Sequence, residues 1–297
     1  MTKKSGFIIL TILAVVLAGF VITAVLAVGV YGFGWNNQLT RGIVKLVPLP
    51  AAMVNGHFVT LNEVYAREKM LEKALRFQSG PTEIGLEQSR DILNQLIEEQ
   101  IVKNLAAAQG IVVTAAELDR YFLYLLNRFS INPEEADEKI REIFGVGAAE
   151  YQSRIVMPDL LEQELRLYLN ESSLDELRFQ AAAFVQKRLI DGMDFAEAVK
   201  TYSQDEHTKY LGGDLGFVAS NELPYWLADP AFGLETGEIS QIIFSPEGYH
   251  ILEVVLKDSS SDPGQIRLRH IFFEGEDFEA FLENAKKSYN IYAFEKI

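Results

Sequence analysis

The chain has 297 residues, a formal net charge of −15 and no cysteine. An acidic chain argues against a nucleic-acid ligand, because phosphate backbones need a basic face. Without cysteine there is no disulfide framework, no thiolate metal site and no cysteine nucleophile. The length allows about two domains with additional segments.

The first feature is an apolar run without charge at residues 7–30, preceded by Lys3 and Lys4. As a helix rising about 1.5 Å per residue, this run is long enough to cross a hydrocarbon core of about 30 Å. The two lysines favour a cytoplasmic N-terminus and an extracytoplasmic body. A cleaved signal peptide is the alternative, although its apolar core is normally only about 7–15 residues. We therefore expect residues 1–35 to form a cytoplasmic tip and a retained transmembrane anchor. Aromatic residues are expected at the level of the lipid head groups: Tyr31, Phe33 and Trp35.

Residues 36–50 are expected to be a juxtamembrane spacer that Pro48 and Pro50 stiffen at its end. Beyond them, residues 51–172 carry helical signals. Helix-opening capping boxes occur at Thr60–Glu63 and Thr114–Glu117. Helices are predicted over residues 86–109, after Asn132-Pro133, and over residues 148–170 with a bend near Pro158.

The last part, residues 173–297, changes character. A helix capped at Ser173–Glu176 and one capped by Asp194 precede short apolar runs that are separated by closely spaced turn residues. The pattern predicts a strand after Gly212-Gly213, a short helix opened by Pro230 and a hairpin ending at residues 248–251. A polar loop, a strand at 265–273 and a helix at 277–289 follow. The fold class is α+β: a transmembrane helix, an all-α region and a small domain with an antiparallel-rich sheet.

Three motifs in this order, GGDLG (212–216), DPAFGLETGEIS (229–240) and GYHI (248–251), resemble the parvulin family of peptidyl-prolyl cis-trans isomerases. The stretches VNGHFVTLNEVYAREKM and LNQLIEEQIVKNLAAAQGIVVTAAELD resemble the helical N-terminal region of SurA-type chaperones and PrsA-type foldases. The resemblance implies an isomerase without cofactor or metal that acts on unfolded or X-Pro-containing polypeptides. The helical region would hold unfolded chain, or would serve as a structural stalk or dimerisation bundle.

The order of the strands departs from the family. A parvulin normally begins with a strand reading roughly Arg-His-Ile-Leu, whereas the matching residues here, 269–272, come last. Either the domain is circularly permuted, so that this strand lies beside the strand of His250, or a second repeat begins at residue 266. We expect permutation, because a lone strand and helix cannot bury a core.

The resemblance also implies site residues. The polar centre would be His250 and His270 on adjacent strands, with Ser245 orienting the pair and Asp205 facing the substrate. The apolar pocket would come from Leu215, Leu223, Leu227 and Phe232, with Trp226 replacing Leu227 if the register slips by one; each could also be an ordinary core residue. His57 and His207 are expected at the surface. The acidic loop Glu274–Asp277 would repel a phosphate, which argues against phosphoserine-proline substrates.

Three functions follow as hypotheses. The first is a membrane-anchored, extracytoplasmic isomerase that assists the folding of exported proteins. The second is a non-catalytic holdase chaperone that binds extended unfolded chains. The third is a scaffold that tethers one partner at the membrane surface.

Overall fold

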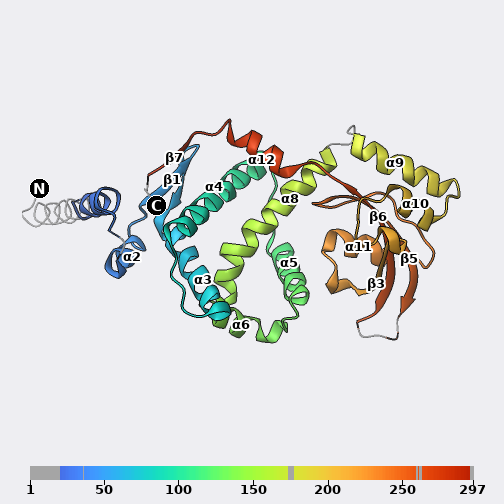
Figure 1. The fold of residues 1–297 in the computed structure, drawn as a ribbon, viewed down its shortest axis with the longest axis horizontal. Coiled ribbons are helices and arrows are strands. Elements are labelled where there is room, and N and C mark those ends of the chain that lie inside the picture. The colour runs from blue at the N-terminus through green and yellow to red at the C-terminus, as the bar shows by residue number, and fades with distance from the viewer. Residues whose placement is uncertain (1–20, 36, 173–176, 259, 261–262, 295–297) are drawn as a thin grey trace, which may run out of the picture. The chain divides into compact units, whose positions relative to one another are not determined.

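The structure, a computed structural model, describes residues 21–35, 37–172, 177–258, 260 and 263–294 (Figure 1). The chain divides into two compact units. The first comprises the described parts of Met1–Ile101, Ile143–Gly145 and Ser288–Ile297, and the second comprises those of Val102–Glu142 and Val146–Lys287. The domain bounds predicted above were drawn from sequence motifs, whereas these two units are defined by contacts within the fold. The predicted bounds stay a prediction.

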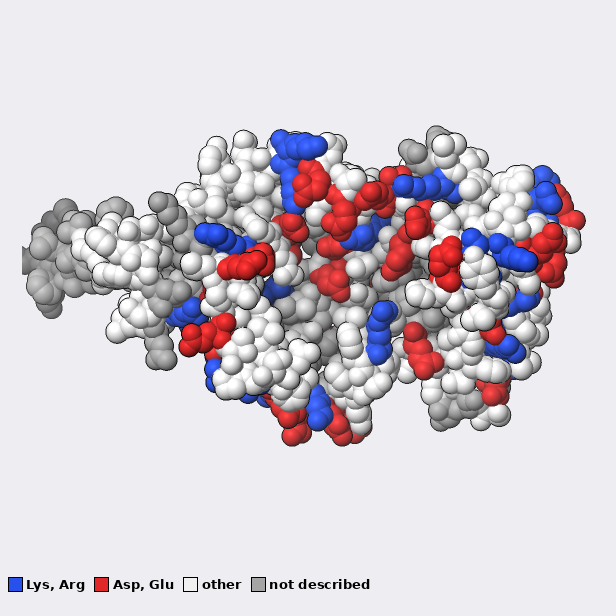
Figure 2. All heavy atoms as spheres, in the orientation of Figure 1, with Lys and Arg blue, Asp and Glu red and all other residues white. Residues whose placement is uncertain are grey.

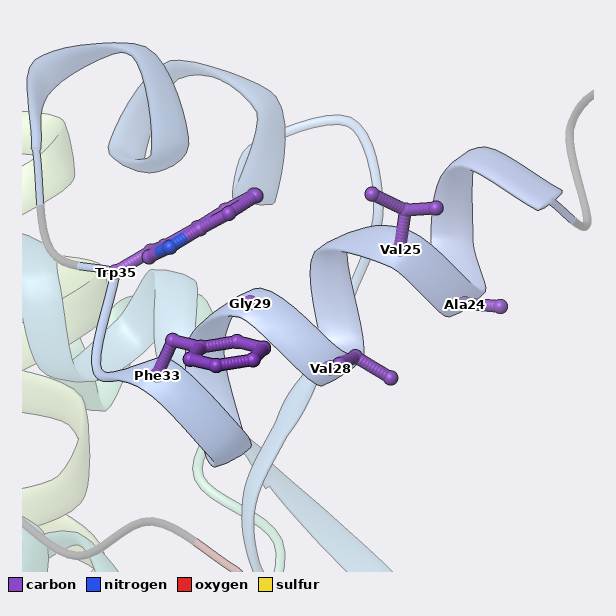
Figure 3. Close-up of a pocket in the computed structure, with 6 residues that line it drawn as sticks. All are labelled: Ala24, Val25, Val28, Gly29, Phe33 and Trp35. Carbon is purple, nitrogen blue, oxygen red and sulfur yellow. The ribbon is translucent and has the colours of Figure 1, made fainter.

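The apolar run ends, in the first unit, in a helical turn against which the Trp35 side chain folds back. Residues 21–27 are helical and continue into a π-helical turn, η1 (Val28–Gly32). The N–H of Trp35 donates to the carbonyl of Gly29 at 3.0 Å, and the indole covers Gly29 so closely that a Cβ there would lie 2.2 Å from the ring (Figure 3). Residues 1–20 of the predicted anchor lie outside the described residues. Among the residues that are described, no helix is both long and apolar enough to span a bilayer.

The predicted spacer contains a helix, α2 (Gln38–Val44), which was not predicted. Asn37 caps it, because its side chain accepts a hydrogen bond from the N–H of Thr40 at 2.9 Å. Val44 is buried and fixes the other end of the helix.

A small sheet follows in the order β2-β1-β7. Asn55 and Gly56 form the hairpin turn with φ values of 47° and 86°. The third strand, which we did not predict, comes from the far end of the chain and pairs antiparallel with β1. The bounds are β1 (Pro50–Val54), β2 (His57–Thr60) and β7 (Ile291–Ala293).

The predicted helices of residues 51–172 are present. The capping box of Thr114 and Glu117 is complete, and Thr60 accepts from the N–H of Glu63. The expected irregularity near Pro158 is a π-helical turn just before it; Pro158 has no N–H to offer the preceding turn. The elements are α3 (Leu61–Ser79), α4 (Leu86–Ala108), α5 (Ala115–Arg128), η2 (Pro133–Glu135), α6 (Ala136–Phe144), α7 (Ala148–Tyr151), η3 (Gln152–Val156) and α8 (Met157–Ser172).

The remainder of the second unit is built on a four-stranded antiparallel sheet in the order β3-β6-β5-β4. The late strand β6 lies between β3 and β5, so it completes this sheet and lies beside the strand of His250, as expected. The cap predicted at residues 173–176 lies outside the described residues. The elements are α9 (Leu177–Ile190), α10 (Phe195–Tyr202), η4 (Lys209–Leu211), β3 (Asp214–Ala219), η5 (Ser220–Glu222), α11 (Tyr225–Gly233), β4 (Ile243–Phe244), β5 (Gly248–Asp258), β6 (Gln265–Glu274) and α12 (Phe278–Lys286).

The prediction that Pro230 opens a helix was wrong. Helix α11 begins at Tyr225 with Pro224 as its N-cap, and Pro230 lies inside it. Pro230 leaves the carbonyl of Trp226 without its intrahelical donor, a cost that this short helix accepts because Ala228 and Ala231 are buried. The last helix was also too long in the prediction, since α12 ends at Lys286.

The two faces of the sheet carry separate cores. Tyr249, Ile251, Ile271 and Phe273 pack on the side of α9 and α10. The opposite face, with Leu252, Val254, Ile266 and Leu268, packs against Ala231 of α11. Because side chains alternate along a strand, His250 and His270 belong to the α11 face.

Candidate active site

The two predicted histidines lie diagonally across β5 and β6. His250 is opposite Phe272 and His270 is opposite Leu252. Their ring centroids are 5.6 Å apart with an interplanar angle of 26°, and the ring of Phe272 lies 5.0 Å from that of His250. Both histidines are buried, with 6% and 9% of their surface exposed. The sheet therefore holds the imidazoles as a fixed, largely water-free pair.

His270 binds the carboxylate of Asp205. Its Nε2 lies 2.8 Å from Asp205 Oδ2 and 3.0 Å from Thr208 Oγ1, and the Thr208 hydroxyl donates to the same Oδ2. A carboxylate can only accept, so Nε2 of His270 carries the proton. Asp205 is held in place because the preceding residues pair with β6: Phe272 N–H donates to Ser203 Oγ at 3.2 Å.

His250 binds Ser245 in the opposite sense. Ser245 Oγ accepts from the N–H groups of Glu247 and Gly248 at 3.2 and 3.1 Å and lies 2.9 Å from His250 Nε2. With both lone pairs in use, the hydroxyl donates its proton to Nε2, which places the imidazole proton on Nδ1. That Nδ1 is buried without a hydrogen-bond partner among the described residues. The two rings thus have opposite tautomers.

The charges of the site follow from burial and from these contacts. Burial, with a smaller effect of His270, lowers the pKa of His250 to about 3. Burial also lowers the pKa of His270, although Asp205 opposes it. Burial alone would raise the pKa of Asp205, but hydrogen bonds from Thr208 and His270 outweigh it and lower this pKa to about 2. At neutral pH the site is one carboxylate beside two neutral imidazoles.

The lowered histidine pKa predicts acid sensitivity. The unfolded chain takes up a proton on His250 near pH 6.5, whereas the folded chain does so only near pH 3. Between these values the unfolded state binds more protons, so the free energy of unfolding falls as the pH falls, by at most about 1.4 kcal/mol per pH unit for this group. Urea unfolding of the second unit from pH 7.5 to 4.5 measures the slope. His250→Asn should show a shallower slope; an equal slope in both proteins would contradict the assignment.

Ser245→Ala should destabilise the second unit by about 1–3 kcal/mol, because it leaves His250 Nε2 buried without a donor and removes the side-chain acceptor of the Glu247 N–H. Urea unfolding measures the loss. Ser172→Ala, which removes an exposed hydroxyl bonded to the carbonyl of Tyr168, is the control and should change stability little. Equal stability of Ser245→Ala and the parent would show that Ser245 does not hold the histidine.

The predicted apolar wall divides into two parts. Leu215, Leu223 and Phe232 pack around the core on the α11 face of the sheet, the face that carries the histidines. Trp226 turns elsewhere: its ring lies 6.0 Å from that of Tyr121 in α5 and 5.1 Å from that of Tyr225. Leu227 is half-buried. The predicted exposure of His57 and His207 is confirmed.

Two residues of this centre were missed. Thr208 binds both Asp205 and His270, and Phe272 stacks near both histidines. The Asp-x-x-Thr spacing in a loop could have indicated Thr208, since a hydroxyl three residues on can reach back to the carboxylate. For Phe272 the alternation of β6 was the signal, because it shares a face with His270.

The second unit contains a small domain built on a four-stranded antiparallel sheet. The face of this sheet that α11 covers carries a buried histidine pair and a charged aspartate. Residues 169–255 match the family described as PPIC-type PPIase domain, the parvulin-type peptidyl-prolyl isomerases. Residues 1–139 match the SurA-like N-terminal domain. The chain therefore carries a parvulin-type domain and a SurA-like N-terminal domain. The match to the first ends before β6, so the strand of His270 lies outside it.

The similar proteins with printed names include a SurA chaperone and a PrsA foldase. Chaperone SurA of Methylobacillus flagellatus is 26% identical over 242 residues, which are 67% of this chain and 55% of that protein. Foldase protein PrsA of Caldanaerobacter subterraneus subsp. tengcongensis is 29% identical over 175 residues, 55% of each protein. A crystal structure of the peptidylprolyl isomerase PrsA from Bacillus anthracis aligns with a TM-score of 0.24 and 16% identity, covering 66% of this chain and 86% of that one. The chain spans little more than half the length of the first two relatives.

Proposed function

We propose that the protein is a membrane-anchored, extracytoplasmic peptidyl-prolyl cis-trans isomerase that assists the folding of exported proteins. The observation that carries the activity is the hydrogen bond of 2.8 Å between charged Asp205 and neutral His270, on the sheet face that also carries Leu215 and Phe232. The parvulin-type domain supports the reaction type, and the printed names of the relatives, chaperone and foldase, support polypeptide clients.

The chemistry requires no bond to be broken. Rotation about an X-Pro bond passes a barrier that approaches the ∼18–20 kcal/mol of an ordinary peptide bond, because the twisted amide loses its resonance. In that state the prolyl nitrogen gains lone-pair character and the carbonyl oxygen becomes less negative. The apolar wall of Leu215, Leu223 and Phe232 would hold the proline ring and favour the less polar twisted state. The fixed negative charge of Asp205 would interact with the substrate amide. An interaction that is stronger in the twisted state than in the planar state lowers the barrier.

The anchor and the location are part of the proposal. The uncharged run at residues 7–30 and the two lysines before it support an N-terminus in the cytoplasm and a body outside. Val25, Val28 and Phe33, near the end of that run, are exposed apolar side chains that a bilayer would cover. In Figure 2 the acidic and basic side chains are interspersed on the visible face, as on a protein whose body remains in water.

The test of activity measures cis-trans isomerisation of an X-Pro peptide by the full chain in detergent micelles. His270→Gln should lose most of the rate acceleration, while His57→Gln, an exposed histidine of the first unit, should retain it. If the parent accelerates no X-Pro peptide but suppresses aggregation of an unfolded client, the holdase function replaces the isomerase. One tight stoichiometric partner with neither activity would favour the scaffold.

The test of the anchor is independent of activity. The full chain reconstituted into vesicles should float with the lipid. In molecules whose body faces the outside of the vesicle, external protease should digest the body, while a short N-terminal fragment stays protected. A chain that remains at the bottom of the gradient would overturn the anchor and leave the isomerase proposal intact.

A further inference from the structure

A buried asparagine in the last turn of α8 contacts two loops next to the histidine pair, within the second unit. Only 1% of the surface of Asn170 is exposed. Its Nδ2 donates to the carbonyl of Ser245 at 2.8 Å and to that of Pro246 at 3.3 Å, and its Oδ1 accepts from the N–H of Glu276 at 2.8 Å. The mechanism above does not use this residue.

The partners of Asn170 require an amide at this position. On one side two carbonyl oxygens need a donor, and on the other side a backbone N–H needs an acceptor, so the partners fix the orientation of the amide group. An aspartate has the same shape but would place an acceptor against the two carbonyls. A leucine would fill the same space but could form none of these hydrogen bonds. Asn170 therefore acts through its hydrogen bonds rather than through its volume.

The loop after β6 is shaped around the same side chain. A Cβ at Gly275 would lie 2.3 Å from Asn170 Oδ1 and 2.6 Å from its Cγ. Among the described glycines Gly275 is not one of those with a positive φ, so the close contact with Asn170 favours glycine here, rather than backbone conformation. The N–H of Gly275 donates to the carbonyl of Glu247 at 2.8 Å. The end of α8, the loop after β6 and the turn between β4 and β5 therefore meet at Asn170.

The turn between β4 and β5 carries the serine that holds His250. Ser245 Oγ lies 2.9 Å from His250 Nε2, and the carbonyl of the same serine is a group that Asn170 binds. Hydrogen bonds between the backbones of Ser245 and Gly248 fix the shape of the turn, but they do not fix where it lies relative to α8. The Asn170 amide does so, and the hydroxyl of Tyr249 adds a bond of 3.3 Å to the Asn170 carbonyl.

Resting on the proposed isomerase function, we propose that Asn170 is a positioning residue of the active site, whose amide places the Ser245 hydroxyl against His250 Nε2. A displaced turn would release the His250 imidazole, whose ring centroid lies 5.6 Å from that of His270. Because the two rings stack, movement of His250 would disturb the bond between His270 and Asp205. Asn170 acts through Ser245 and needs no contact with the substrate.

The first test reads the tautomer of His250, which does not depend on turnover. The chain has four histidines, so NMR of the full chain in detergent micelles with histidine-selective isotope labelling can assign each ring. In the parent, His250 should carry its proton on Nδ1 at neutral pH. In Asn170→Ala and Asn170→Asp, its ring-nitrogen signals should move toward the average of the two tautomers. Parent-like His250 signals in both variants would overturn the proposal.

Leu160→Ala is the control for a general loss of stability. It shortens a side chain that is fully buried in α8, earlier in the helix than Asn170. It should lower the urea midpoint of the second unit, because it leaves a cavity, but it should not change the tautomer of His250. A tautomer change in Leu160→Ala equal to that in Asn170→Ala would show that loss of stability, rather than loss of the amide, releases His250, and would overturn the proposal.

Gly275→Ala tests the same contact from the other side and keeps Asn170 in place. The added methyl group should displace the amide and reproduce the tautomer change. It should lower the urea midpoint in the parent, but less in the Asn170→Ala background, where the space is free; residues in contact are non-additive in this way. Equal shifts in the two backgrounds, with a parent-like tautomer in Gly275→Ala, would show that Asn170 does not join the two loops, and this variant decides the question if the Asn170 variants do not fold.

Activity separates this proposal from the isomerase function. In Asn170→Ala, kcat for X-Pro isomerisation should fall about three- to tenfold, the range for one lost hydrogen bond, with KM nearly unchanged because the apolar wall is intact. Leu160→Ala should keep the parent's kcat. If the parent itself accelerates no X-Pro peptide, the isomerase function fails, while the tautomer still decides whether Asn170 positions Ser245. An active parent whose kcat survives in Asn170→Ala would overturn the positioning role.

Discussion

Replacing Asp205 with alanine should lower kcat/KM for X-Pro isomerisation by about 10- to 100-fold. The carboxylate is charged at neutral pH and accepts from both His270 and Thr208. A hydrogen bond to a charged group contributes about 1.5–3 kcal/mol, and each 1.4 kcal/mol corresponds to a factor of ten in rate. On the proposed mechanism, removing the charge removes the electrostatic partner of the substrate amide, and His270 keeps only its contact with Thr208.

Two further variants separate the charge of Asp205 from its shape and from a general loss of charge. Asp205→Asn keeps the shape and one acceptor but removes the charge, so it should fall between the parent and Asp205→Ala. Asp191→Ala removes an exposed carboxylate paired with Lys187 and should keep full activity. Urea unfolding of each variant shows whether the fold survives. A folded Asp205→Ala protein with the parent's kcat/KM would remove Asp205 from the mechanism.

Replacing Gly213 with alanine should destabilise the second unit by about 2–5 kcal/mol. The glycine has a φ of +78°, and a Cβ there would lie 2.3 Å from the carbonyl oxygen of His270. Positive φ costs an L-residue about 1–2 kcal/mol, and overpacking against backbone adds about 1–3 kcal/mol. The same close approach allows His270 N–H to donate to Gly213 O at 2.9 Å, so the clash falls on the strand that carries the site.

Gly216 is the matched control for this effect. Its φ of +77° is nearly the same, but a Cβ there would meet nothing within 4 Å. Gly216→Ala should therefore cost only the conformational part, about 1–2 kcal/mol. Trp226 reports on the second unit, and a Trp35→Phe background removes the other tryptophan. Equal losses for the two glycine variants would show that backbone conformation, rather than the contact with β6, makes Gly213 necessary.

Local signals predicted the ordered elements well, because their causes lie within a few residues. Thr60, Thr114 and Asp194 accept hydrogen bonds at helix starts in the structure. Pro230 misled the prediction, since proline is favoured in the first turn of a helix, yet burial of the neighbouring alanines carries α11 past it. Strand β7 gave no signal: its three residues are exposed, and only pairing with β1 makes them a strand.

The candidate centre was predicted where a motif marks a residue and missed where only three-dimensional contact does. His250 and His270 were found through GYHI and the late strand, and they do lie together. The direction of Trp226 could not be predicted, because the ring that it contacts, Tyr121, lies more than a hundred residues earlier. The catalytic and binding roles of the predicted site residues stay predictions, and the variants above test them.

The pairing of β7 with β1 makes the first unit depend on the order of synthesis. Residues 50–54 are synthesised long before their partner at 291–293. Until then one edge of β1 has unpaired backbone groups, a surface that readily recruits other extended chains. Contacts between such distant residues also close a very long loop, which slows folding more than it reduces stability.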